Sequence, residues 1–408
     1  MPSLISHLES AIDGTLLPAD RVQTMHRDRP LWVRYDLPAV GKALTKEMLR
    51  DRPATMWRYA ELLPVDEAGA VSLGETMTPL VHCPKLGARY GLSDLWIKDE
   101  SRLPTGSFKS RGLAMAVSMA RRLGIRRVAI PTAGNAGGAL AAYAARAGME
   151  AFVFMPADTP IVNQYECRLL GAKTFLVDGL ITDCGRIVRE GREPAGWFDM
   201  STLKEPYRIE GKKTMGLELA EQCDWRLPDV ILYPTGGGTG LIGMWKAFGE
   251  LAALGWLEGD KLPRMVAVQS DGCAPIVRAF DQGERFATPF ADAATIASGI
   301  RVPAAIGDFM ILDAVRASGG RALAVSEGRL REWMALAAEA EGIAVCPETA
   351  ACVGALERLA AEGWIKPDER VVIFNTGAAQ KYPEAMAVDL PRLAPGDPPD
   401  WQRIIAGG

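Results

Sequence analysis

Residues 95–112 read LWIKDESRLPTGSFKSRG, and this stretch decides the fold that we expect. An apolar strand runs into a loop with proline and glycine, and a helix opens near Ser107. Lys109 therefore lies in the first turn of a helix, whose positive end disfavours a cation. Desolvation and the helix dipole both lower a lysine pKa, which suits an amine that must be neutral for part of its work. Taken alone, an exposed surface lysine is the alternative interpretation.

Helix-like segments that end in glycine alternate with short apolar runs over most of the chain. Glycine is the usual left-handed cap after a helix, and the alternation indicates βαβ units in doubly wound sheets. Because 408 residues are many for one compact unit, we expect two domains, or one large α/β domain with a smaller partner. The predicted strands are 127–130, 151–155, 174–177, 229–233, 265–269 and 371–375, with a helix over 239–254.

The two ends of the chain carry weaker patterns. The region 30–64 is rich in proline and arginine and has no strand period, which predicts short helices and loops. The proline-rich segment from Pro391 onward predicts a tail that wraps the surface. Residues 1–15 lack the basic start and apolar run of a signal peptide, and no apolar stretch is long enough to span a membrane, so we expect a cytoplasmic protein.

Charge and composition argue against several classes of function. Lys and Arg number 46 and Asp and Glu 50, a net charge of −4, whereas a nucleic-acid or anionic-membrane partner requires a basic face. The seven cysteines include no C-x-x-C pair, which argues against a disulfide framework and a zinc cluster. All three histidines precede residue 90, so we expect neither a histidine-based metal site nor a catalytic triad.

Residues 130–147, IPTAGNAGGALAAYAARA, form a second candidate site. A strand ends, and Thr132, Ala133 and Gly134 form a tight polar turn before Asn135 and an alanine-rich helix. Backbone N–H groups and a hydroxyl at a helix start suit a carboxylate, and the Asn135 amide suits a ring oxygen. A plain N-capping turn is the alternative.

Residues 233–243, YPTGGGTGLIG, also run from a strand into a helix. Successive glycines let backbone N–H groups close around a phosphate at the positive helix end. The segment 238–243 matches G-x-G-x-x-G, but the next strand ends in Gln269-Ser270 without the acidic residue that binds a ribose, so a single phosphate is favoured over a dinucleotide. Residues 211–214, GKKT, end like another phosphate loop, but Pro206 occupies the place of its upstream glycine.

A fourth segment, 371–383 (VVIFNTGAAQKYP), places Thr376 at the carboxyl end of a strand, where ligands bind in open α/β sheets. In this order the four segments resemble the fold-type II pyridoxal-phosphate enzymes of the tryptophan synthase beta-like superfamily, and most of all the threonine synthase family. Residues 104–112, PTGSFKSRG, are similar to that family's P-T-G-S-F-K-x-R-G. Residues 29–35, 71–80 and 341–351 also resemble it.

The resemblance implies a role for each matching residue. Lys109 would carry pyridoxal 5'-phosphate as a Schiff base beside Phe108, and Thr376 would face the pyridine nitrogen. The other cofactor contacts would be Asn135, Gly236, Gly237, Gly238, Thr239 and Gly240. The substrate contacts would be Thr132, Ala133, Gly134, Ser201, Thr202, Lys204 and Arg208.

The resemblance also implies an architecture of two doubly wound α/β domains with the cofactor in the cleft between them. Residues 1–99 would form an N-terminal extension and part of the large domain, 100–203 the small domain, and 204–408 the part of the large domain that binds the cofactor phosphate. A homodimer is expected from the same resemblance.

The expected activity is that of a threonine synthase, which converts O-phosphohomoserine and water to threonine and phosphate by γ-elimination and β-addition. The chain departs from the family at 201–208, where STLKEPYR stands in place of a pattern resembling N-S-x-N-P-x-R. Ser110 also stands where Asp is frequent. The alternatives are another lyase or synthase of this type (threonine or serine dehydratase, diaminopropionate ammonia-lyase, phosphoserine-dependent synthase) and a catalytically silent binder.

Overall fold

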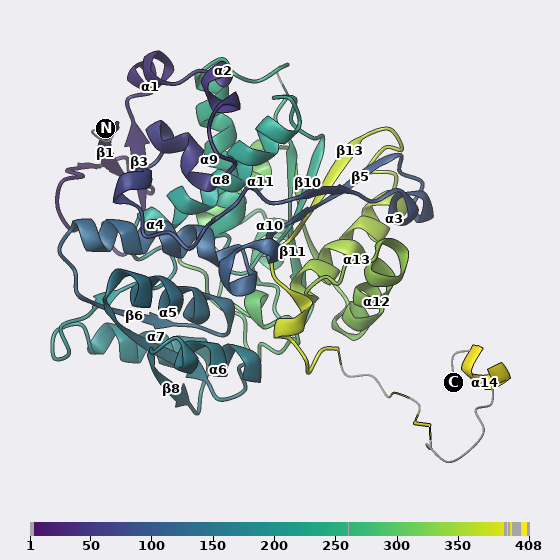
Figure 1. Ribbon diagram of the computed structural model, residues 1–408. Coiled ribbons are helices and arrows are strands. Elements are labelled where there is room, and N and C mark those ends of the chain that lie inside the picture. The colour runs from purple at the N-terminus through teal and green to yellow at the C-terminus, as the bar shows by residue number, and fades with distance from the viewer. Residues whose placement is uncertain (1–3, 260, 387–389, 391, 394–400, 406–408) are drawn as a thin grey trace.

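The computed structural model describes residues 4–259, 261–386, 390, 392–393 and 401–405. The strands of these residues form three sheets, and helices pack around them (Figure 1). The strand orders are β2-β1-β3, β12-β11-β10-β13-β5-β4 and β8-β7-β6-β9. Most of the tail that was predicted to wrap the surface lies outside the described residues; the part that is described includes a short helix, α14 (Trp401–Ile405).

The four-stranded sheet is parallel throughout. Helix α5 lies against one face of it and α7 against the other, and α4 packs beside α5 (Figure 1). The strand runs that were predicted here are confirmed to within two residues. The elements are α4 (Lys109–Arg122), β6 (Arg127–Pro131), α5 (Asn135–Ala147), β7 (Glu150–Pro156), α6 (Ile161–Leu169), β8 (Lys173–Val177), α7 (Ile181–Glu190) and β9 (Phe198–Asp199).

The six-stranded sheet is parallel except for its edge strand β4, which pairs antiparallel with β5. Apolar side chains of α3, α12 and α13 fill one face, and those of α8, α9, α10 and α11 fill the other. The strands are β4 (Leu80–His82), β5 (Asp94–Asp99), β10 (Val230–Pro234), β11 (Arg264–Ser270), β12 (Arg321–Val325) and β13 (Arg370–Asn375). The helices are α3 (Pro84–Arg89), α8 (Tyr207–Gln222), α9 (Thr239–Ala253), α10 (Pro275–Asp281), α11 (Asp308–Ala317), α12 (Leu330–Glu341) and α13 (Pro347–Ala361).

The N-terminal region corrects one prediction. Short helices and loops were predicted over 30–64, and α1 (Leu37–Ala43), α2 (Lys46–Arg50) and the 3-10 helix η1 (Met56–Leu62) are present. Residues 31–35, however, form strand β3 (Leu31–Tyr35), which pairs with β1 (Ile5–Ser10) in a sheet completed by β2 (Leu16–Leu17). The prediction was wrong there: every second side chain of β3 is buried, and Arg34 on the other face pairs with Glu9 at 2.8 Å, so this arginine belongs to a strand and not to a loop.

Helix α8 lies in the interior between α4 and α9 and carries two networks of buried charges, one around Glu218 and one around Glu210. In one, the Arg111 guanidinium contacts Glu100 at 2.6 Å and Glu218 at 2.5 Å, and Lys98 contacts Glu218 at 2.9 Å. All four side chains are fully buried, so each charge depends on its partners. The arginine of the PTGSFKSRG motif therefore ties the start of α4 to α8.

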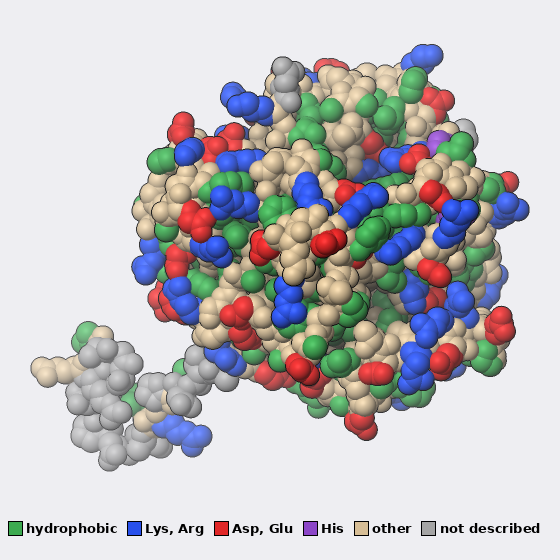
Figure 2. Space-filling model, turned by 180° about the vertical axis from the view of Figure 1, so that it is seen from behind, with side chains coloured by type: hydrophobic (Ala, Val, Ile, Leu, Met, Phe, Trp, Pro, Cys, Tyr) green, Lys and Arg blue, Asp and Glu red, His purple; other side chains and the backbone are tan. Residues whose placement is uncertain are grey.

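The surface mixes charges of both signs. Figure 2 shows Lys and Arg side chains interspersed with Asp and Glu over the face in view, without one large field of either sign. All seven cysteines are buried free thiols. Among the described residues, the helices are too short or too polar to cross a membrane.

Candidate functional site

A cavity of about 390 Å³ opens where the carboxyl ends of β6, β10 and β13 meet the first turn of α4. In open α/β sheets this edge is where ligands bind. The predicted contact residues that line it are Phe108, Lys109, Thr132, Ala133, Gly134, Asn135, Ser201, Thr202, Lys204, Gly236, Gly237, Gly238, Thr239, Gly240 and Thr376. Arg208 is not among the described residues that line it.

Lys109 is the first residue of α4, and its Nζ lies 4.4 Å from the centroid of the Phe108 ring. Burial lowers the pKa of Lys109 to about 8, and the nearby Arg208 charge adds to the effect, while Glu348 opposes it. More of this amine is therefore neutral near physiological pH than in an ordinary lysine, as a nucleophile or a proton carrier requires.

The glycine-rich loop between β10 and α9 forms a cradle that only glycine can build. Gly238 has φ +70°, and a Cβ there would overlap the Ile311 side chain. A Cβ at Gly240 would overlap the hydroxyl of Tyr233, which itself has no hydrogen-bond partner among the described residues. The loop opens a helix of 15 residues, so its N–H groups and the helix dipole favour a phosphate.

Asn135 offers a buried amide to the cavity. Its Nδ2 donates to the Tyr382 hydroxyl at 2.8 Å, and its Oδ1 has no partner among the described groups. The two ends of an amide are interchangeable in assignment, and turning this one lets Oδ1 accept from Tyr382 and directs the NH₂ group to a ligand oxygen. An orphaned buried polar atom of this kind indicates a ligand contact.

The turn before α5 is shaped by Thr132. Its Oγ1 donates to the Gly134 carbonyl at 2.9 Å and accepts from the N–H groups of Gly134 at 3.1 Å and Gly137 at 3.2 Å. The turn therefore has both of the roles that the sequence allowed. The Thr132 hydroxyl caps the helix, and Ala133 and Asn135 line the cavity.

Thr376 follows β13 and lies beside a small cluster of sulfur and oxygen atoms. Its Oγ1 is 3.6 Å from the Cys346 Sγ, which is also 3.1 Å from the Thr349 Oγ1. The backbone N–H of Thr376 donates to Thr349 Oγ1 at 3.1 Å. Because the three groups fix one another, the Thr376 hydroxyl has a defined place on the cavity wall.

The segment 201–208 is partly engaged by a buried carboxylate. Asp199 accepts hydrogen bonds from the Ser201 hydroxyl and, at 3.1 Å, from the Lys204 Nζ. The Arg208 Nη1 donates to the Met200 carbonyl at 2.9 Å, and its Nε has no partner among the described groups. Burial lowers the pKa of this arginine, so an anion nearby would stabilise it.

The sequence prediction missed other polar residues on the wall of this cavity: Tyr233, Ser298, Glu348, Tyr382, Thr182 and Arg189. Glu348 accepts from the Gly299 N–H at 2.7 Å through Oε1, and its buried Oε2 has no partner among the described atoms. Glu348 and Tyr382 lie in segments 341–351 and 371–383, which had been singled out without roles for these residues. Arg189 lies on an amphipathic helix whose sequence carries no sign of the site.

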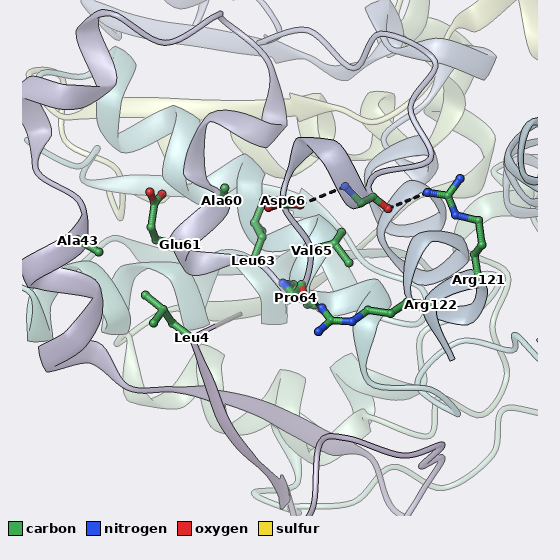
Figure 3. Close-up of a pocket in the computed structure, with 11 residues that line it drawn as sticks. Leu4, Ala43, Ala60, Glu61, Leu63, Pro64, Val65, Asp66, Arg121 and Arg122 are labelled. Carbon is green, nitrogen blue, oxygen red and sulfur yellow. Dashed lines mark hydrogen bonds between the residues drawn. The ribbon is translucent and has the colours of Figure 1, made fainter. Parts of the chain in front are cut away.

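A second cavity, of about 510 Å³, lies near the N-terminal region (Figure 3). Its walls are mostly apolar side chains, including Leu4, Leu63 and Val65. Arg121 turns to the Gly69 carbonyl at 3.0 Å, and Arg122 turns to the Pro64 carbonyl at 3.1 Å. Because its cations are engaged by backbone oxygens, this cavity is a weaker candidate for chemistry than the one that contains Lys109.

Comparison with protein families matches residues 71–377 to the family described as pyridoxal-phosphate dependent enzyme. The chain is 36% identical to the threonine synthase of Methanocaldococcus jannaschii over 357 residues, which is 87% of either chain. It is 33% identical to the threonine synthase of Mycobacterium tuberculosis over 345 residues, which covers 84% of this chain and 92% of the relative.

Solved structures share the fold. Maize serine racemase superposes with a TM-score of 0.64 at 22% identity, over 74% of this chain and 88% of the racemase. The diaminopropionate ammonia lyase of Escherichia coli, in complex with D-serine, superposes with a TM-score of 0.65 at 18% identity, over 77% of this chain and 88% of the lyase. At these identities the likeness establishes the fold.

Proposed function

The chain belongs to the threonine synthase family of pyridoxal-phosphate dependent enzymes, and on that premise we propose that it converts O-phosphohomoserine and water to threonine and phosphate. It is a pyridoxal-phosphate dependent lyase of fold type II. The observation that carries the substrate assignment is the charge of the cavity wall, whose described residues include the cations Lys109, Arg189 and Lys204 and the carboxylate of Glu348. Such a wall favours an anionic substrate.

The residues present fit the cofactor. Residues 236–240 line the cavity at the start of α9, and Gly238 and Gly240 admit no side chain, so backbone N–H groups would border a phosphate there. The amide of Asn135 has an orphaned atom for a ring oxygen, and Thr376 offers a hydroxyl for the ring nitrogen. Lys109 would hold the cofactor covalently.

When bound, pyridoxal phosphate draws electrons from the substrate Cα and so makes its proton removable. Lys109, with its lowered pKa, takes that proton and moves protons at the later steps, each transfer contributing on the order of 10²–10⁴-fold. A hydroxyl at Thr376 cannot hold a proton on the ring nitrogen as a carboxylate does, which favours eliminations and replacements over transamination. The start of α5, at Thr132–Asn135, would orient the substrate carboxylate.

The phosphate of the substrate would lie toward Thr202, Lys204 and Arg189. The Thr202 methyl lies 3.0 Å from the place of a Cβ on Gly237, so this side chain borders the cradle. Charge-assisted hydrogen bonds from Lys204 and Arg189 would hold the leaving group. Arg208, buried behind this segment with an Nε that has no partner among the described groups, would add a positive field.

A second candidate function is another lyase or synthase of the same fold, such as a dehydratase, a diaminopropionate ammonia-lyase or a phosphoserine-dependent synthase. The observation that favours it is Asp199, which already engages Ser201 and Lys204 and so reduces what they offer to a phosphate.

Turnover decides between the two functions. Purified protein would be incubated with O-phosphohomoserine, and free phosphate and threonine would be followed together, with Lys109→Ala as the control. Matched release that is lost in the control supports threonine synthase. No release from a protein that shows the visible absorbance of its cofactor removes that assignment, and phosphoserine and diaminopropionate would then be tested.

We further expect a cytoplasmic homodimer and the domain division 1–99, 100–203 and 204–408. Sedimentation of the purified protein would test the dimer, and limited proteolysis would test the boundaries.

A further inference from the structure

The GKKT segment at 211–214 is not a phosphate loop, because it lies in the first half of the buried helix α8. Its two lysines have different surroundings. Lys213 contacts Glu210 at 2.8 Å and Glu250 at 2.9 Å, as a buried ammonium should. Lys212 instead places its Nζ 2.5 Å from the carbonyl oxygen of Phe108, the residue that precedes Lys109.

The space around Lys212 is shaped for this side chain. It is fully buried, and the neighbouring helices α4 and α9 each present a glycine to it. A Cβ at Gly112 would lie 2.8 Å from the Lys212 Cε, and one at Gly243 would lie 3.0 Å from its Cβ. Burying an amine with a carbonyl as its hydrogen-bond acceptor is unfavourable for stability, so a functional reason for its presence is worth seeking.

Lys212 and Lys109 meet at one aromatic ring. The Lys212 Nζ lies 3.6 Å and the Lys109 Nζ 4.4 Å from the centroid of Phe108. The Phe108 ring also packs edge to face on Tyr233 at 6.0 Å, and its backbone N–H donates to the Thr376 carbonyl at 3.1 Å. The residue before Lys109 is thus held at its amide by the Thr376 carbonyl, at its ring by Tyr233, and at its carbonyl by Lys212.

We propose that Lys212 is a positioning residue that acts on Lys109 through the carbonyl and ring of Phe108. Its amine fixes the peptide that opens α4 and so sets the direction in which the Lys109 side chain enters the cavity. Burial and the charges of Lys109 and Arg208 hold the pKa of Lys212 well below its usual value, and its amine donates a hydrogen bond to the Phe108 carbonyl. The inference rests on Lys109 as the cofactor lysine and not on the identity of the substrate.

The test uses the holoenzyme and two variants. Lys212→Met keeps the length and apolar stem and removes the donor, whereas Lys212→Gln keeps an N–H donor and removes the amine. The visible circular dichroism of bound pyridoxal phosphate is the first readout, because an achiral cofactor shows a signal only when its surroundings hold it in one orientation. Steady-state kcat and KM are the second. Lys366→Met is the control, since this exposed lysine also donates to a backbone carbonyl, that of Gly363 at 2.7 Å.

The expected result is a Lys212→Met protein that binds cofactor but has a reduced visible dichroism signal, with kcat lower on the order of 10- to 100-fold and KM little changed. Lys212→Gln should recover much of both quantities, and Lys366→Met should match the wild type. If Lys212→Met does not fold, a Lys212→Gln enzyme with near-normal dichroism and kcat supports the proposal.

Two results would overturn it: a Lys212→Met enzyme with wild-type dichroism and kcat, or folded Met and Gln variants that are equally impaired. Failure of the threonine synthase assignment is distinguishable, because the wild type would then show the dichroism signal without forming threonine.

Discussion

The backbone N–H of Phe108 donates to the carbonyl oxygen of Thr376 at 3.1 Å, which joins the start of α4 to the end of β13. Ser107 and Gly377 form an isolated bridge at the same place. Two segments from opposite ends of the family match therefore meet at one edge of the cavity. Thr376 is part of this junction and Lys109 comes directly after it, so backbone hydrogen bonds set the relative position of the two residues.

Lys109 should be the residue that carries the cofactor. Reduction of the holoenzyme with borohydride, followed by digestion and mass spectrometry, should place the cofactor mass on the peptide that contains Lys109. Lys212 is the informative internal control, because its amine lies near the same ring but its side chain does not line the cavity. Cofactor mass on Lys212, or on no lysine, would contradict the assignment of Lys109 as the residue that carries the cofactor.

Gly240→Ala should weaken cofactor binding strongly, because the new methyl would overlap the Tyr233 hydroxyl and displace the start of α9. Gly249→Ala is the matched control, since Gly249 lies exposed on the same helix with no atom within 4 Å of the place of its Cβ. It should raise stability by roughly 0.5–1 kcal/mol, the usual gain of alanine over glycine in a helix. Cofactor titration by absorbance would measure the first effect and thermal unfolding the second. If the two variants bound pyridoxal phosphate with equal affinity, residues 236–240 would not form the phosphate site.

Arg111→Ala should lower the free energy of unfolding by about 3–5 kcal/mol, because it leaves Glu100 and Glu218 buried without their main partner. Arg102→Ala is the comparison: that arginine pairs with Asp99 at 3.0 Å, but its side chain is 70% exposed, so a loss of at most about 1 kcal/mol is expected. Urea unfolding of the two proteins measures the difference. If the two variants lost similar free energies of unfolding, solvent would reach the network of Arg111, Glu100 and Glu218.

Lys204→Met should lower kcat/KM for O-phosphohomoserine far more than for an unphosphorylated amino acid, because it removes a cation from the cavity wall. The expected loss is about 1.5–3 kcal/mol, the range of a charged hydrogen bond, or roughly 10- to 150-fold. Lys173→Met, at an exposed lysine paired with Glu150, should leave both values unchanged. An equal loss with both substrates would show that Lys204 acts through Asp199 on the fold of the segment.

The protein without cofactor should gain stability as the pH rises from about 8 toward 10.5, the two pKa values of Lys109 in the folded and unfolded chain. Between them the unfolded chain binds one proton more, so the free energy of unfolding increases with pH by up to about 1.4 kcal/mol per pH unit. Below pH 8 the full cost of burying the amine is present. Urea unfolding of wild-type and Lys109→Met proteins from pH 7 to 10 isolates the effect. If the free energy of unfolding changed with pH in the same way in both proteins, Lys109 would be solvated and not buried.

Much of the site could be predicted from the sequence because its parts are local. The glycines at 236–240 and the position of Lys109 at a helix start are properties of short segments. The loops that follow parallel strands lie at the same edge of the sheet, so these segments could be expected to meet. The strand runs at 127–130 and 371–375 were visible because buried parallel strands are continuously apolar.

The rest depends on packing between segments that no local pattern connects. Glu348 and Tyr382 reach the cavity from α13 and the segment after β13, and Arg189 reaches it from α7. Lys204 turns to Asp199, five residues before it, and the sequence pattern did not indicate this contact. The same holds for Lys212, whose surroundings are set by glycines on two other helices. Strand β3 was missed because its arginine makes an edge strand look like a loop.

The most direct test of the proposed reaction is turnover of O-phosphohomoserine in water enriched in ¹⁸O. If phosphate leaves by elimination at Cγ and water adds at Cβ, the threonine hydroxyl should carry the label and the released phosphate should carry none. Labelled phosphate with homoserine as the other product would show hydrolysis at phosphorus, and it would contradict the account.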